Sequence, residues 1–196
     1  EAIARLRATG HQRAQLKPRF FSVTYGAGGS TRERTLNAVL DIRDSGCDAA
    51  PHISCVGSSL DDISATLELY KANGLRHIVA LRGDQPSGTA SPGELRYANE
   101  LVEFIRRTTG DHFHIEVACY PEFHPQARSV NDDLQAFKRK VEAGADGAIT
   151  QYFFNADAYF RFIDDCEALG ISVPIVPGIM PINNFFQMAR FSDMCG

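Results

Sequence analysis

Several features that would mark a membrane-spanning, secreted or nucleic-acid-binding protein are missing from this sequence. No apolar run approaches the length needed to cross a bilayer. No signal peptide is visible, although the chain starts at Glu1 rather than Met, so an N-terminal portion is expected to be absent. The net charge of −4 implies no general attraction to nucleic acid or to anionic lipid. The composition, 44% hydrophobic and 22% charged, predicts an ordinary globular protein.

Paired cysteines are also missing. The five cysteines are odd in number and form no CxxC pair: Cys47, Cys55, Cys119, Cys166 and Cys195. This usage is typical of reduced, mostly buried thiols and predicts a cytoplasmic protein. Cys55 and Cys119 lie within apolar runs and are expected to be inert. The segment "HISC" (52–55) resembles half of a metal site, but no matching ligand pair accompanies it, so no metal is expected.

What is present is one repeating pattern, in which a helix-like segment ends near a glycine and an apolar, β-rich run follows. The six runs are 17–26, 46–57, 74–84, 111–122, 144–154 and 170–181. The glycines before five of them are Gly46, Gly74, Gly110, Gly144 and Gly170. Residues 61–74, 97–110 and 130–144 carry apolar side chains at helical spacing. This alternation predicts a parallel sheet covered by helices.

The length of 196 residues and the absence of linkers or low-complexity tracts predict a single domain over 1–196. An open doubly wound sheet needs five or six strands, whereas a (β/α)8 barrel needs eight. The chain begins with a helical pattern (1–16) and stops in or just after another, so one strand is expected before the first run and one after the last. The predicted fold class is therefore α/β, a TIM barrel of which this chain covers about six strand–helix units.

Polar residues gather where the predicted strands end, which is where such barrels place their chemistry. They include Thr24, Tyr25, His52, Ser54, Arg82, Asp84, Tyr120, Glu122, His124 and Gln151. Several have simpler interpretations: His52 as a core histidine, the glycines of 26–29 as a turn, and the basic residues 138–140 as a solvated helix face. No GxGxxG motif is present, so a Rossmann nucleotide site has no support.

The tripeptide Arg82-Gly83-Asp84 is the hardest feature to explain structurally. Burying two charges at a strand end is costly and rarely a net gain. A glycine between them suggests that a ligand or another backbone comes close. A cell-adhesion role would need an exposed loop on a secreted protein, whereas here the tripeptide terminates an apolar run.

Six motifs, taken together and in order, resemble the methylenetetrahydrofolate reductase family, closest to its bacterial single-domain type. They are "SVTYGAGGSTRERT", "APHISC", "HIVALRGDQP", "VACYPEFHPQA", "KRKVEAGADGAITQYFF" and "PIVPGIMPINNF". The resemblance implies a FAD-binding TIM barrel. It implies that NADH or NADPH reduces the flavin, which then passes hydride to 5,10-methylenetetrahydrofolate, giving 5-methyltetrahydrofolate for one-carbon metabolism and methionine biosynthesis. It also implies a homo-oligomer.

The resemblance implies a role for each matching residue. Asp84 is the catalytic aspartate beside the flavin. The cofactor-binding residues are Thr24, Tyr25, His52, Arg82, Gly83, Asp84, Tyr97, Ala98, Tyr120, His124, Ala127, Asp133, Arg139 and Lys140. The substrate-binding residues are Gln151, Gln187 and Phe191. Cations at 139 and 140 would neutralise phosphates, which replaces the interpretation of a solvated helix face.

Two alternatives to this reductase remain open at the level of sequence. One is a flavin-independent pterin- or folate-binding barrel that transfers a one-carbon unit, and the other is a non-catalytic truncated barrel. The family's general acid is a glutamate on a strand that this sequence does not include. Neither Glu122 nor Glu116 is expected to replace it, and Glu116 is interpreted as a structural or outward-facing residue.

Overall fold

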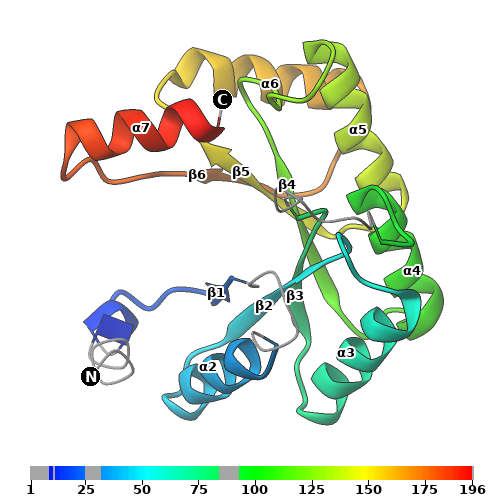
Figure 1. Cartoon of the computed structure of the whole chain (residues 1–196). Helices are drawn as coiled ribbons and strands as arrows, with labels where there is room; N and C mark the ends of the chain where they lie inside the picture. The colour runs from blue at the N-terminus through cyan, green and yellow to red at the C-terminus, as the bar shows by residue number, and fades with distance from the viewer. Residues whose placement is uncertain (1–8, 11, 25–31, 84–92, 196) are drawn as a thin grey trace. The chain divides into compact units, whose positions relative to one another are not determined.

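The computed structural model describes residues 9–10, 12–24, 32–83 and 93–195. Strands and helices alternate through them (Figure 1): β1 (Phe21–Val23), α2 (Arg32–Asp44), β2 (Ala49–Ser54), α3 (Leu60–Ala72), β3 (His77–Leu81), α4 (Ala98–Thr109), β4 (His114–Cys119), α5 (Val130–Glu142), β5 (Gly147–Tyr152), α6 (Ala156–Ala168), β6 (Ile175–Gly178) and α7 (Phe185–Cys195). Each of the six β-rich runs contains one strand, so the predicted alternation is confirmed. Tyr25 and Asp84 lie outside the described residues.

Hydrogen-bonded strands follow one another in chain order from β1 to β6. The pairs β1–β2, β2–β3, β4–β5 and β5–β6 are parallel, with partners such as His52 opposite Val79 and Glu116 opposite Gly147. A doubly wound sheet reverses its strand order at a switch point, whereas a TIM barrel adds each strand beside the preceding one. The sequential order therefore confirms the predicted barrel class.

The chain divides into two compact units, Glu1–Ile115 and Glu116–Gly196, with the boundary inside β4. In the first unit, Ile78, Val79 and Ala80 of β3 are all buried, so both faces of this strand are covered, as a parallel sheet requires. In the second unit, the rings of Phe137 (α5) and Phe162 (α6) lie 5.8 Å apart between their centroids. The single domain predicted over 1–196 stays a prediction.

Glycines end the helices where the sequence pattern places them. The five predicted glycines all have positive φ: 85° at Gly46, 67° at Gly74, 57° at Gly110, 112° at Gly144 and 73° at Gly170. Residues with side chains rarely adopt this conformation, so glycine reverses the chain after each helix at little steric cost. Each reversal returns the chain to the start of the next strand.

Within the ranges 9–10, 12–24, 32–83 and 93–195, no helix combines the length and the apolar character that crossing a membrane requires.

Candidate functional site

In the first unit, the ends of β2 and β3 and the start of α4 are joined by direct contacts. The carbonyl of Arg82 accepts the backbone N–H of Val56 at 3.0 Å and the thiol of Cys55 at 3.5 Å. The Cys55 thiol also lies 3.9 Å from the carbonyl oxygen of Tyr97. These contacts bring Arg82 and Tyr97, two of the predicted cofactor-binding residues, to the same edge of the sheet.

Gly83 is enclosed by the end of the neighbouring strand. Its φ is 85°, and a Cβ at this position would lie 3.0 Å from Cβ and 3.2 Å from Oγ of Ser54. Both observations require glycine, since L side chains are strained at this φ and the space beside the backbone is taken. The sequence suggested that a ligand or another backbone comes close to Gly83, and the end of β2 is one such neighbour.

His52 and Thr24 are the other predicted contacts described in this unit. His52 is partly buried in β2, and this burial lowers its pKa below 6.5, so the imidazole is neutral at neutral pH. Thr24 is exposed just after β1, and its carbonyl accepts the Thr35 hydroxyl at 3.2 Å. Ala98 is the first residue of α4. The unit thus presents a neutral imidazole, a cation and an exposed phenol at 58% exposure on Tyr97.

In the second unit, the loop after β4 is tied to α5 by Asp133. The Asp133 carboxylate accepts the backbone N–H of His124 at 2.9 Å. Nδ1 of His124 accepts the N–H of Gln126 at 3.0 Å, which leaves the proton of the neutral ring on Nε2. The rings of Tyr120 and His124 meet edge to face, 4.7 Å apart. Ala127, whose N–H donates to the His124 carbonyl at 2.8 Å, closes the loop.

This loop also carries backbone strain. Phe123 has a φ of 77°, which is uncommon for a residue with a large side chain, and the side chain is 44% exposed. Strained residues of this kind gather at functional sites, because the surrounding contacts must hold them in place.

The two cations of α5 have different environments. Arg139 is exposed, whereas Lys140 is partly buried and its ammonium donates to the Ala118 carbonyl at the end of β4. Burial lowers the pKa of Lys140, and the nearby Cys119 and Asp133 oppose that shift. An ammonium has three protons to donate, so one bond to Ala118 leaves capacity for an anion. A solvated helix face describes Arg139 but not Lys140.

The predicted substrate residues lie on β5 and α7. Gln151 is near the end of β5, and its Oε1 accepts the N–H of Tyr152 at 3.1 Å. Phe191 is 41% exposed and stacks on Tyr152 at 5.9 Å with an interplanar angle of 18°. Tyr152 and Ser192 share a hydrogen bond of 3.0 Å through their hydroxyls. Gln187 is exposed on α7. β5 and the C-terminal helix are therefore held together by aromatic stacking.

Some residues that shape this edge were not singled out from the sequence. Tyr152 directly follows Gln151 in β5, and its ring stacks on Phe191. Glu100 accepts the backbone N–H groups of Arg96 at 2.6 Å and Tyr97 at 3.2 Å, and so orients the start of α4. Its spacing could have identified Glu100 from the sequence. It lies three residues after Tyr97, the residue that precedes α4, and this is the spacing of a capping box.

The buried thiols fit the interpretation of inert cysteines. Burial raises the pKa of Cys55 to about 11 and that of Cys166 to about 12, and it raises the pKa of Cys119 still further. A thiol is nucleophilic as a thiolate, so these groups are unreactive near neutral pH. Among the cysteines whose side chains the structure describes, Cys47, Cys55, Cys119 and Cys166 are all free.

The whole chain, residues 1–196, matches the family model described as methylenetetrahydrofolate reductase. It is 47% identical over 182 residues to the 5,10-methylenetetrahydrofolate reductase of Escherichia coli K12, an alignment that covers 92% of this chain and 60% of the relative. It is 40% identical over 192 residues to the methylenetetrahydrofolate reductase (NADH) 1 of Zea mays, covering 91% of this chain and 32% of the relative. The chain thus spans 60% or less of the length of these two relatives.

Two solved structures share the fold at low sequence identity. A Clostridium thermocellum protein whose structure binds two copies of 5-methyl-5,6,7,8-tetrahydrofolic acid aligns with a TM-score of 0.65 and 12% identity, over 96% of this chain and 64% of that one. A putative lyase/mutase from Burkholderia cenocepacia J2315 aligns with a TM-score of 0.61 and 17% identity, over 95% and 71%. At such identities the likeness supports the fold alone.

Replacing Gly83 with alanine should destabilise the protein more than replacing Gly46 does. Both residues have a φ of 85°, but nothing lies within 4 Å of a Cβ built at Gly46. Gly46→Ala should therefore lose only the conformational term of roughly 1–2 kcal/mol, and Gly83→Ala should lose roughly 1–3 kcal/mol more from crowding against Ser54. Urea unfolding of both variants measures the difference, and equal losses would show that Ser54 moves away without cost.

Replacing His52 with asparagine should make stability less dependent on pH. Burial holds the folded-state pKa of His52 below 6.5, so the unfolded chain takes up the proton first as the pH falls. The free energy of unfolding therefore decreases below pH 6.5 in the parent protein, and this part of the decrease should vanish in His52→Asn. Unfolding at pH about 7.5 and about 5.5 tests this, with His112→Asn as the control. Identical pH dependence in all three proteins would contradict it.

Proposed function

Because this chain belongs to the methylenetetrahydrofolate reductase family, we propose that the protein reduces 5,10-methylenetetrahydrofolate to 5-methyltetrahydrofolate. We propose FAD as its cofactor and NADH or NADPH as the electron donor. The observation that carries the proposal is the family match over all 196 residues. The placement of polar side chains at the carboxyl ends of the strands supports it, since this is the reactive end of a TIM barrel.

The residues present fit a flavin dinucleotide. The isoalloxazine ring is flat and would approach the backbone at Gly83, just after β3, from a side other than the one that Ser54 fills. The pyrophosphate carries negative charge, and the exposed Arg139 and the ammonium of Lys140 supply cations. When bound, FAD supplies the hydride transfer itself: it accepts a hydride from the nicotinamide and delivers it to the folate.

In this proposal the first unit contributes Thr24, Tyr25, His52, Arg82, Gly83, Tyr97 and Ala98 to the flavin. His52 is neutral at neutral pH because burial lowers its pKa, so it can hydrogen-bond without adding a positive charge beside the ring. Arg82 contributes the one guanidinium of this group. Asp84 would place a carboxylate near the flavin, where it favours a cationic form of the folate by charge attraction.

The second unit contributes Tyr120, His124, Ala127, Asp133, Arg139 and Lys140. Asp133 acts as a positioning residue, because its carboxylate already holds the backbone of the loop at His124. Arg139 and Lys140 would bind the pyrophosphate and ribose region. Because Asp133 orders the loop after β4 through a contact within the protein, the positive charges of Arg139 and Lys140 remain available to bind the ligand.

Folate and nicotinamide would take turns beside Gln151, Gln187 and Phe191. The two amide side chains offer both hydrogen-bond donors and acceptors, which match the mixed edge of a pterin. Phe191 offers an aromatic face, and its stacking on Tyr152 sets the orientation of that face. Sharing one position between two substrates predicts ping-pong kinetics. We also propose, from the family resemblance and the free cysteines, a cytoplasmic homo-oligomer.

The direct test is the visible spectrum of the purified protein, followed by two anaerobic additions. We expect a flavin band that bleaches with NADH or NADPH and recovers when methylenetetrahydrofolate is added, because each addition completes one half of the reaction. Steady-state rates should give the parallel double-reciprocal lines of a ping-pong mechanism. A colourless protein that does not take up added FAD would contradict the proposal, and folate binding by such a protein would favour a flavin-independent one-carbon transferase.

Replacing Arg139 with alanine should weaken FAD binding without weakening riboflavin binding to the same degree, because riboflavin lacks the pyrophosphate. Loss of one charge-assisted hydrogen bond is worth about 1.5–3 kcal/mol, which is roughly a 10- to 150-fold rise in Kd. Lys138→Ala is the matched control: it removes a cation from the same helix, but that cation lies 3.7 Å from Glu142. Fluorescence titration measures the Kd of FAD and of riboflavin for each variant. Equal changes in Arg139→Ala and Lys138→Ala would show that only the net charge of the helix matters, and would contradict a specific role for Arg139.

A further inference from the structure

In the second unit, β5 contains one residue more than β6 over the stretch where the two strands pair. Ile149 lies opposite Val176. The next pair joins Tyr152 to Gly178, so three steps along β5 match two steps along β6. An extra residue of this kind is a β-bulge, which bends the strand and redirects its side chains. The bulge falls just before Tyr152, on the stretch that includes the proposed substrate residue Gln151.

A buried threonine side chain holds the bulge. Thr150 is only 5% exposed, and its hydroxyl oxygen accepts the backbone N–H of Gly178 at 2.8 Å. In a regular parallel ladder this N–H would donate to a backbone carbonyl of β5, so the hydroxyl takes the place of a ladder acceptor. A Cβ at position 178 would collide with the Thr150 carbonyl oxygen, so glycine is required there. The two strands are therefore joined at this point by a side chain.

On its other side, β5 pairs regularly with β4. The register is unbroken over four successive pairs, which end with Cys119 opposite Thr150. The first of these pairs joins Glu116 to Gly147, and a Cβ at Gly147 would lie 2.6 Å from Oε2 of Glu116. Glu116 is only 7% exposed, so its interpretation as an outward-facing residue is wrong. Between these described strands, the irregularity lies on the β6 side of β5.

The bulge decides which side chain lies opposite the end of β6. In a regular ladder Gly178 would pair with Gln151, whereas the bulge puts Tyr152 there. A shift of one residue exchanges the two faces of a strand. With the bulge in place, the Tyr152 ring stacks on Phe191 at 5.9 Å, and the Tyr152 N–H donates to Oε1 of Gln151 at 3.1 Å. Because the amide oxygen is held on the backbone, the amide N–H groups of Gln151 are its donors for a ligand.

We propose that Thr150 is a positioning residue for the substrates: its hydroxyl fixes the bulge, and the bulge sets the directions of Gln151 and Tyr152. The inference rests on the proposed reductase function, in which Gln151 and Phe191 bind the folate and the nicotinamide. Thr150 is buried, so it acts through these neighbours and does not touch a substrate. Nothing in the sequence distinguishes it, because threonine is common in strands.

Substitutions of Thr150 that weaken the acceptor step by step test the proposal. Thr150→Val keeps a similar shape but cannot accept the Gly178 N–H, so the KM values for methylenetetrahydrofolate and for the nicotinamide donor should both rise, by roughly 10- to 100-fold. Thr150→Ser keeps the hydroxyl and should give KM values near those of the parent. Thr150→Cys supplies a weaker acceptor and should give intermediate values, which keeps the test valid where Thr150→Val does not fold. The Kd for FAD should stay at the parent's value throughout.

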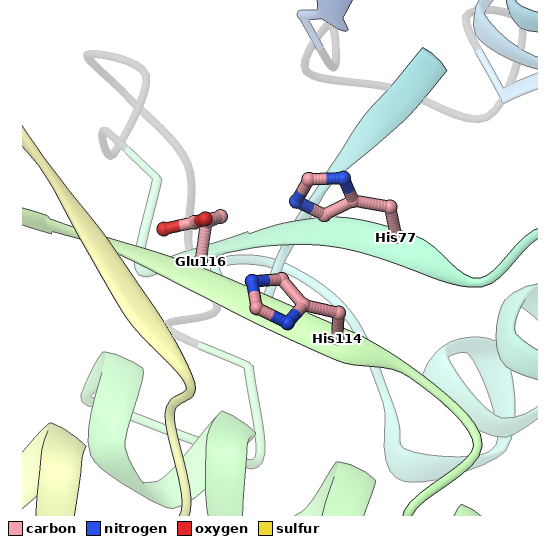
Figure 2. Close-up of side chains that lie close together, drawn as sticks. All are labelled: His77, His114 and Glu116. Atoms are coloured by element: carbon pink, nitrogen blue, oxygen red, sulfur yellow. The ribbon is translucent and has the colours of Figure 1, made fainter. Parts of the chain in front are cut away.

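Two control variants separate positioning from loss of stability. Thr66→Val removes another hydroxyl that is also 5% exposed, and this one donates to the Asp62 carbonyl at 2.8 Å. His77→Ala removes a ring that meets the ring of His114 edge to face in the first unit, with 4.8 Å between centroids (Figure 2). Both variants should lower the melting temperature and leave the two KM values unchanged.

The results distinguish this proposal from the proposed function. An active parent whose KM values do not change across the Thr150 variants would overturn the role of Thr150 and leave the reductase function standing. A rise in KM of the same size in Thr66→Val or His77→Ala would also overturn it, because the effect would then follow stability. A parent that does not reduce methylenetetrahydrofolate would overturn both.

Discussion

Parallel strand pairing requires the chain to return to the same edge of the sheet after every strand, and the other features of this molecule depend on that return. Each helix brings the chain back, and a glycine with positive φ reverses it at the end of the helix, as at Gly46 and Gly170. Because the paired strands within each unit then run the same way, the strand ends of that unit meet at one edge and its strand starts at the other. The separation of chemistry from structural support follows from this geometry.

Where neighbouring parts of the sheet come close together, glycine is required because there is no room for a side chain. Gly83 lies against Ser54 of β2, and Gly147 lies against Glu116 of β4. In the first case the missing side chain lets the chain after β3 pack against the end of β2, and in the second it makes space for a buried carboxylate. The two glycines perform different tasks through the same physical property, a Cα that carries no obstruction.

A partly buried cation of α5 bears on the proposed cofactor site. The Lys140 ammonium is held by the Ala118 carbonyl, and burial lowers its pKa, so its positive charge has a cost that a bound phosphate would offset. An opposite charge supplied by a ligand favours the charged form of such a group.

The sequence by itself determined the order of strands and helices, because apolar periodicity and helix-ending glycines are local properties of the chain. It also determined which residues follow each strand, and so placed Arg82, Gly83 and Gln151 correctly at strand ends. It could not show that Ser54 crowds Gly83, that Lys140 reaches Ala118 or that His77 meets His114. These contacts join residues far apart in the chain. Only tertiary structure decides them, because strand register and side-chain direction across neighbouring strands are set by packing and not by local spacing.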